Sequence, residues 1–80
     1  MLTTEEILET VKKALELDRI PSMEDSVDSL EEWDSLGHLS MLVALDKKLN
    51  GKAAKLQELG SCQSITQLIS ILKKNKLIES

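Results

Sequence analysis

The sequence predicts an all-α fold: a four-helix bundle with three longer helices, one short helix, and a long loop between the first and second helices. Two segments begin with a capping box, in which Ser or Thr precedes Glu or Gln by three positions at a helix start. Apolar residues recur at helical spacing in three segments, and no segment alternates between apolar and polar residues as a half-buried strand does. The 80 residues are expected to form a single domain, residues 1–80, with one small core.

The first helix is predicted from the capping box Thr3-Thr4-Glu5-Glu6, with Thr3 as its N-cap. Pro21 disfavours helical geometry at Ile20, so the helical region is expected to end there. Five apolar residues fall on one face of this helix: Ile7, Leu8, Val11, Ala14 and Leu15.

A polar and acidic connection, residues 21–34, is predicted to follow. Loops of this length between helices are usually functional or held to the core. Val27 and Leu30 are isolated apolar residues in this segment, so we expect them to anchor it.

The second helix is predicted from Ser35 to Leu49 and is the most apolar segment. Its apolar residues cover more than one face, so the helix is either central to the core or shows part of its surface to a partner. Asn50-Gly51 is expected to stop it, with the glycine in the left-handed conformation. The apolar residues are Leu36, Leu39, Leu42, Val43, Leu45 and Leu49.

The rest of the chain is predicted to hold a short helix within residues 52–59, a break at Gly60-Ser61, and a last helix. Ser64 and Gln67 form the second capping box. The stripe that follows has the spacing i, i+3, i+4, i+7 and consists of Ile65, Leu68, Ile69 and Leu72.

Charge and composition exclude several classes of function. Residues 1–46 carry twelve acids and three bases, whereas residues 47–80 carry two acids and seven lysines. An acidic N-terminal half with a single aromatic residue argues against nucleic acid and favours a basic protein surface as partner. With no apolar run of about 18 residues and no signal-like start, we expect a cytoplasmic monomer without membrane insertion.

The sequence offers little for catalysis or metal binding. The single cysteine, Cys62, is expected to be a buried apolar residue, and no Cys/His cluster exists for a metal. His38 is the only histidine, and the sequence around it does not indicate a catalytic triad of nucleophile, base and orienting residue. We therefore expect His38 to be a solvated surface residue, and we expect no catalytic residue.

The segment Asp34-Ser35-Leu36 is the candidate functional site. Six acids and no base lie in residues 24–34, and Ser35 follows them at the start of an apolar helix. A hydroxyl there lies at the positive end of a helix dipole, near free backbone N–H groups. The position suits a serine that carries a phosphate ester, and equally a serine that only caps the helix.

The segment 32–39, Glu-Trp-Asp-Ser-Leu-Gly-His-Leu, resembles the attachment region of acyl carrier proteins. The family's Asp-Ser-Leu motif matches at Asp34, Ser35 and Leu36, and the resemblance extends to chain length, helix order and the position of the serine. It implies that a phosphopantetheinyl transferase attaches 4′-phosphopantetheine to Ser35, and that the arm holds an acyl group as a thioester. The chain would be a non-enzymatic carrier for a loading ligase and for acyltransferase or synthase enzymes of a fatty-acid-like, polyketide or specialised pathway.

The resemblance also assigns roles to the neighbours of Ser35. Asp34 and Leu36 are expected at the cofactor site, with Asp34 capping the helix. Gly37 would let the arm or a partner approach closely, or would lie in a frayed first turn. Core packing is the alternative for Leu36 and Met41, and packing over the loop–helix junction is the favoured role of Trp33. The residues expected to contact partner enzymes are Trp33, Leu36, His38, Leu39 and Met41.

Several features depart from fatty-acid-synthesis carriers, whose second helix is acidic. Gly37, His38 and Ser40 replace acids there, and residues 52–55 carry lysines. Steering of partners by this helix should be weaker, which indicates a specialised carrier with a narrow partner set. The alternatives are an aminoacyl or peptidyl carrier, a helical adaptor with Ser35 as a cap, and a phosphorylation switch at Ser35.

Overall fold

The computed structural model describes residues 2–79 and contains three α-helices: α1 (Thr4–Leu15), α2 (Ser35–Lys48) and α3 (Ile65–Lys74). Two 3-10 helices, η1 (Ala53–Lys55) and η2 (Gln57–Ser61), lie between α2 and α3. The all-α prediction is confirmed over the described residues, in which β pairing is confined to two isolated bridges.

The predicted four-helix bundle is not what the structure contains, because the short helix expected within residues 52–59 is replaced by η1 and η2. Leu56 has an extended backbone, with φ −98° and ψ 95°, and it divides the two turns. Each turn closes i→i+3 hydrogen bonds. Such bonds are typical of short segments, in which too few bonds form to offset the free energy of nucleating an α-helix. Gly60-Ser61, expected to be a break, forms the end of η2.

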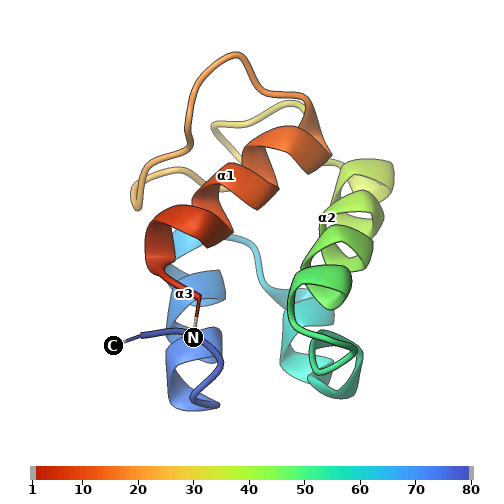
Figure 1. The fold of residues 1–80 in the computed structure, drawn as a ribbon. Helices are drawn as coiled ribbons and strands as arrows, with labels where there is room; N and C mark the ends of the chain where they lie inside the picture. Colours follow the sequence, from red (N-terminus) through yellow and green to blue (C-terminus); the bar gives the residue numbers. More distant parts are fainter. Residues whose placement is uncertain (1, 80) are drawn as a thin grey trace.

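Helix α1 packs most extensively against α2, and α2 and α3 lie on opposite sides of the molecule (Figure 1). The long loop between α1 and α2 passes over one end of the molecule (Figure 1). Near the termini, Leu2 pairs with Ile78, and the N–H of Glu79 donates to the Leu2 carbonyl at 2.9 Å. No helix in residues 2–79 has the length and apolar character needed to cross a bilayer.

The capping box of α1 is confirmed: the Thr3 hydroxyl accepts from the Glu6 N–H, and the Glu6 carboxylate accepts from the Thr3 N–H. The predicted end is wrong, because α1 stops at Leu15 and Glu16 takes the left-handed conformation with φ 57°. The reason is tertiary: the turn at Glu16 directs Leu17 back into the core, where it is buried.

The loop anchors are confirmed. Leu30 is buried, Val27 is partly buried against the core, and the Val27 N–H donates to the Gln63 carbonyl at 2.9 Å. Two further bonds tie the loop to the start of α3: Ile65 N–H to the Asp25 carbonyl at 3.0 Å, and the Thr66 hydroxyl to the Met23 carbonyl at 2.7 Å. The loop is thus fixed on α3, and its far end delivers the chain to α2.

Asp25 organises the same loop and was not singled out by the sequence. Its buried carboxylate accepts two bonds from the Arg19 guanidinium, at 2.9 and 3.1 Å, one from the Ser22 N–H at 2.8 Å, and one from the Ser29 hydroxyl at 3.0 Å. These bonds, chiefly those of Arg19, hold the pKa of Asp25 well below its usual range.

Helix α3 begins as predicted, with Ser64 as its N-cap accepting from the Gln67 N–H. The second half of the box differs, since the Gln67 side chain accepts from the Gln63 N–H at 2.7 Å. All four residues of the predicted stripe are buried: Ile65, Leu68, Ile69 and Leu72.

Candidate functional site

Ser35 is the first residue of α2 and is exposed. The N-cap is Asp34, which has an extended backbone and whose Oδ1 accepts from the Gly37 N–H at 2.8 Å. Within residues 2–79, no hydrogen bond involves the Ser35 hydroxyl. Capping therefore does not explain a serine at position 35, because its neighbour performs that role.

A shallow groove of about 450 Å³ lies beside Ser35. The end of the long loop, the first turn of α2 and the link between η2 and α3 form its walls. It is open to solvent and holds several polar groups. Its lining residues are Val27, Trp33, Asp34, Ser35, His38, Gly60, Ser61, Cys62 and Gln63.

His38 crosses one side of this groove, and the prediction of a solvated histidine is wrong. Its ring is half-buried; Trp33 Nε1–H donates to Nδ1 at 2.9 Å, and Nε2 lies 3.0 Å from the Leu59 carbonyl oxygen. The Trp33 and His38 rings are nearly parallel, with planes 13° apart. His38 and Leu59 are 21 residues apart, so local sequence patterns could not predict this contact.

Trp33 and Met41 are not available as exposed partner contacts, so those two predictions are wrong. Trp33 is 3% exposed and packs at the loop–helix junction, as its favoured role required. Met41 is 0% exposed and belongs to the core. Met41 lies on the inward face of α2 with Leu45, which is also fully buried.

Gly37 is needed by the chain itself, because the long loop approaches it closely. A Cβ atom at this position would lie 2.0 Å from the backbone oxygen of Glu32 and 2.9 Å from Leu15 Cδ2. The loop before the cap thus lies directly against the first turn of α2. Only a residue without a side chain permits this approach, and it brings Trp33 and Asp34 into register with Ser35.

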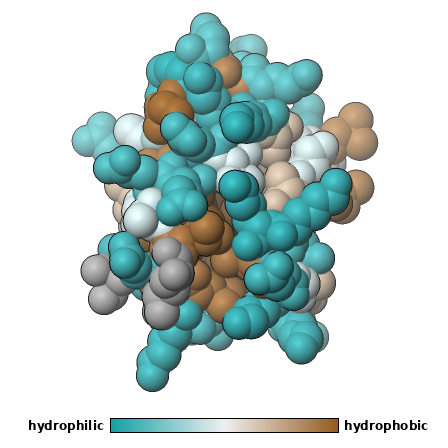
Figure 2. All heavy atoms as spheres, viewed as in Figure 1, coloured by the Kyte–Doolittle hydropathy of each residue, from teal (hydrophilic) through white to brown (hydrophobic). Residues whose placement is uncertain are grey.

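The outward face of α2 carries three exposed apolar residues: Leu36 is 77% exposed, Leu39 59% and Val43 49%. Their spacing of i, i+3 and i+7 places them on one stripe. Core packing, the alternative weighed for Leu36, is wrong. Figure 2 shows hydrophobic side chains projecting at the edge of the molecule beside the first turns of α2.

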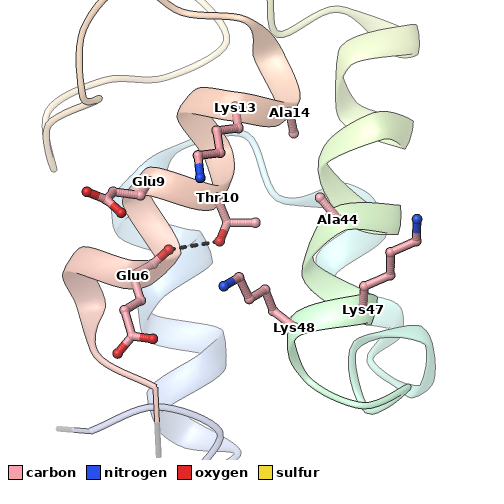
Figure 3. Close-up of a pocket in the computed structure, with 8 residues that line it drawn as sticks. All are labelled: Glu6, Glu9, Thr10, Lys13, Ala14, Ala44, Lys47 and Lys48. Carbon is pink, nitrogen blue, oxygen red and sulfur yellow. Dashed lines mark hydrogen bonds between the residues drawn. The ribbon is translucent and has the colours of Figure 1, made fainter.

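Two further grooves flank α2. One, of about 590 Å³, lies between α1 and α2 and has Ala14 and Ala44 beside charged side chains (Figure 3). Its Thr10 hydroxyl is already bonded to the Glu6 carbonyl at 2.8 Å. The other, of about 480 Å³, lies between α2 and the two 3-10 helices; Leu42, Val43, Leu56 and Leu59 contribute its apolar lining.

Reactive or metal-binding groups are scarce near these grooves. Cys62 is buried, as predicted, and burial raises the pKa of its thiol to about 11, which keeps it protonated. In residues 2–79 no group of three or more His, Cys, Asp or Glu side chains is arranged to hold a metal ion.

Comparison of the chain with protein-family models, with curated proteins and with solved structures finds no match. Function is therefore inferred from the geometry around Ser35 and from the sequence motif that contains it.

Proposed function

We propose that this protein is a non-enzymatic acyl carrier that holds 4′-phosphopantetheine on Ser35. One observation carries the proposal: Ser35 presents an exposed hydroxyl at the N-terminus of a 14-residue α-helix whose capping role belongs to Asp34. A serine that is neither buried nor a cap is free to be modified. The Asp-Ser-Leu motif at residues 34–36 indicates which modification.

The electrostatics of the helix start favour an anionic group on Ser35. The first N–H groups of a helix have no partner within the helix, and the helix dipole stabilises a nearby phosphate by about 0.3–1 kcal/mol at an exposed site. The first turn of α2 contains no acidic residue after the cap that would repel a phosphodiester.

The attachment reaction is assigned to a separate transferase. The Asp34 carboxylate and the His38 ring line the groove with Ser35, but both are bonded to other groups. Neither is directed at the Ser35 hydroxyl as a general base, so the proton must be removed by a partner. This supports a carrier rather than an enzyme.

Partner enzymes are proposed to dock on the stripe Leu36, Leu39 and Val43. These are the transferase, a loading ligase, and acyltransferase or synthase enzymes. An exposed apolar stripe on one helix suits the shallow groove of a partner. The acids of the loop lie ahead of Ser35 while α2 has none in its first turn, so we propose a specialised carrier with a narrow partner set.

The groove between α2 and the 3-10 helices is the proposed place for an apolar cargo. Val43, on its edge, lies eight residues after Ser35, which is about 12 Å along a helix. A pantetheine arm attached to Ser35 spans such a distance. An aminoacyl or peptidyl cargo, the main alternative, would stay in solvent, and a helical adaptor would use the same stripe without any arm.

The test is the mass of the intact protein after co-expression with a broad-specificity phosphopantetheinyl transferase. We expect a gain of one phosphopantetheine group that Ser35→Ala abolishes. Ser40→Ala is the matched control, since Ser40 is also an exposed serine on α2 and should leave the gain unchanged. A phosphate-sized gain would instead support a phosphorylation switch, and no gain under any condition would support the adaptor.

A further inference from the structure

His38 joins three segments around the groove that Ser35 lines. Trp33 ends the long loop two residues before Ser35, His38 lies one turn into α2, and Leu59 belongs to η2. We call the two hydrogen bonds of the His38 ring, to Trp33 and to Leu59, the bridge. The bridge holds Trp33, which precedes the Asp34 cap, against α2 and η2. This is the segment whose position determines how Ser35 is presented.

The two partners of the ring determine its protonation state. An indole N–H can only donate, so Nδ1 of His38 must carry a lone pair; a carbonyl oxygen can only accept, so Nε2 must carry the hydrogen. Only the neutral Nε2–H form satisfies both bonds. The imidazolium would keep the bond to Leu59 but would set two N–H groups against each other at Trp33.

Few charged groups face the ring. The Asp34 carboxylate lines the same groove from the loop, with Oδ1 on the Gly37 N–H. From the link to α3 comes Cys62, a neutral thiol. Glu58 precedes Leu59 in η2, but its carboxylate is 2.7 Å from the Lys74 ammonium. None of these groups can accept the Trp33 N–H in place of Nδ1 without a rearrangement.

We propose that His38 is a positioning residue whose neutral form holds the Trp33–Ser35 segment and whose protonation releases it. The consequence for Ser35 rests on the proposed function: release of the Trp33–Ser35 segment should slow attachment of the arm.

The first test uses the unmodified protein and does not depend on the carrier function. NMR of the imidazole nitrogens should show Nδ1 without hydrogen and Nε2 with hydrogen at about pH 8. As the pH is lowered to about 5, the Trp33 indole N–H resonance should shift. Its protection from exchange, relative to the intrinsic exchange rate at each pH, should fall by about tenfold, since one hydrogen bond is lost. A hydrogen on Nδ1 at high pH, or an indole signal that ignores the titration, would overturn the proposal.

Two variants separate the halves of the bridge. His38→Asn places an amide oxygen near the position of Nδ1, so the Trp33 bond should survive and become independent of pH. His38→Gln reaches toward Leu59 instead and should leave the Trp33 N–H without protection from exchange, relative to the intrinsic rate, at every pH. If both variants titrate like the wild type, His38 is not the proton-sensitive group and the proposal fails.

The functional consequence is read from the rate of phosphopantetheine transfer onto Ser35 with a purified transferase and coenzyme A. The ratio of wild type to His38→Asn cancels the pH dependence of the transferase itself. We expect this ratio to fall severalfold between about pH 8 and pH 5.5 as the wild-type bridge opens. A constant ratio would overturn the positioning role. If neither protein accepts the phosphopantetheine group, the proposed carrier function is contradicted. The NMR test on the unmodified protein would still show whether His38 protonation breaks the Trp33 bond.

Discussion

At the scale of single residues, three positions organise the start of α2. Asp34 caps the helix, Gly37 admits the Glu32 carbonyl, and His38 bonds Trp33 and Leu59. Each of these interactions acts on the backbone next to Ser35. The exposed serine is therefore held by its neighbours while its own hydroxyl stays free.

Gly37→Ala is predicted to destabilise the protein despite the higher helix propensity of alanine. The new Cβ would lie 2.0 Å from the Glu32 oxygen, so the loop or the first turn must move. Overpacking of this kind costs about 1–3 kcal/mol, which exceeds the gain in propensity of about 1 kcal/mol. Urea unfolding measures the change, and Gly60→Ala is the control, because nothing lies within 4 Å of its added Cβ. Equal stability of the two variants would contradict the close approach.

At the scale of elements, α1 and α3 end in the same way. A non-glycine residue takes a left-handed conformation after each helix, Glu16 after α1 and Lys76 after α3. The residue that follows it donates to the carbonyl five positions back. These are the bonds of a Schellman motif. A leucine follows each turn: Leu17 is buried and Leu77 is partly buried. Burial of the following leucine offsets the cost of the left-handed backbone.

Glu16→Gly is predicted to stabilise the protein by about 0.5–1 kcal/mol, because glycine adopts the left-handed conformation without the steric cost of a Cβ. Chemical denaturation measures the free energy of unfolding. Glu9→Gly, an exposed interior position of the same helix, is the matched control and should destabilise by about 1 kcal/mol. The same sign for both variants would show that the turn at Glu16 is not strained.

At the scale of the whole molecule, the long loop is a structural layer rather than a free connection. Asp25 ties Arg19, Ser22 and Ser29 together, while its backbone carbonyl accepts from Ile65 at the start of α3. Loss of this cluster would release the segment that covers one end of the core. The stability of the fold should therefore depend on the charge of one carboxylate.

Acidification is predicted to destabilise the protein through Asp25. The folded-state pKa of Asp25 lies below its ordinary value of 3.8, so the unfolded chain binds the proton more readily. The stabilisation is complete above about pH 5 and is lost as the pH falls through 3.8 toward the lowered folded value. Thermal unfolding between pH 6 and pH 2 measures the slope, which Asp25→Asn should reduce. An unchanged slope in that variant would assign the acid sensitivity to other carboxylates.

The helix starts and the buried faces of α1 and α3 could be predicted because they depend on local chemistry. Thr3 and Ser64 cap within three residues of themselves, and apolar periodicity is a property of each segment alone. The position of Ser35 at the head of α2 followed from the same signals. The prediction of a short helix within residues 52–59 was wrong. This segment is too short for local signals to distinguish one α-helix from two 3-10 turns, so packing decides between them.

The sequence by itself determined the all-α class, the helix starts, the anchored loop and the placement of Ser35 at a helix N-terminus. The cap at Asp34 also agrees with what the sequence indicated. Only the tertiary structure decided that Met41 is buried, that α1 ends at Leu15, and that His38 spans from Trp33 to Leu59. The physical reason is distance along the chain. Caps and periodic faces involve neighbours within a turn or two, whereas burial and bridging depend on which remote segment arrives opposite each side chain.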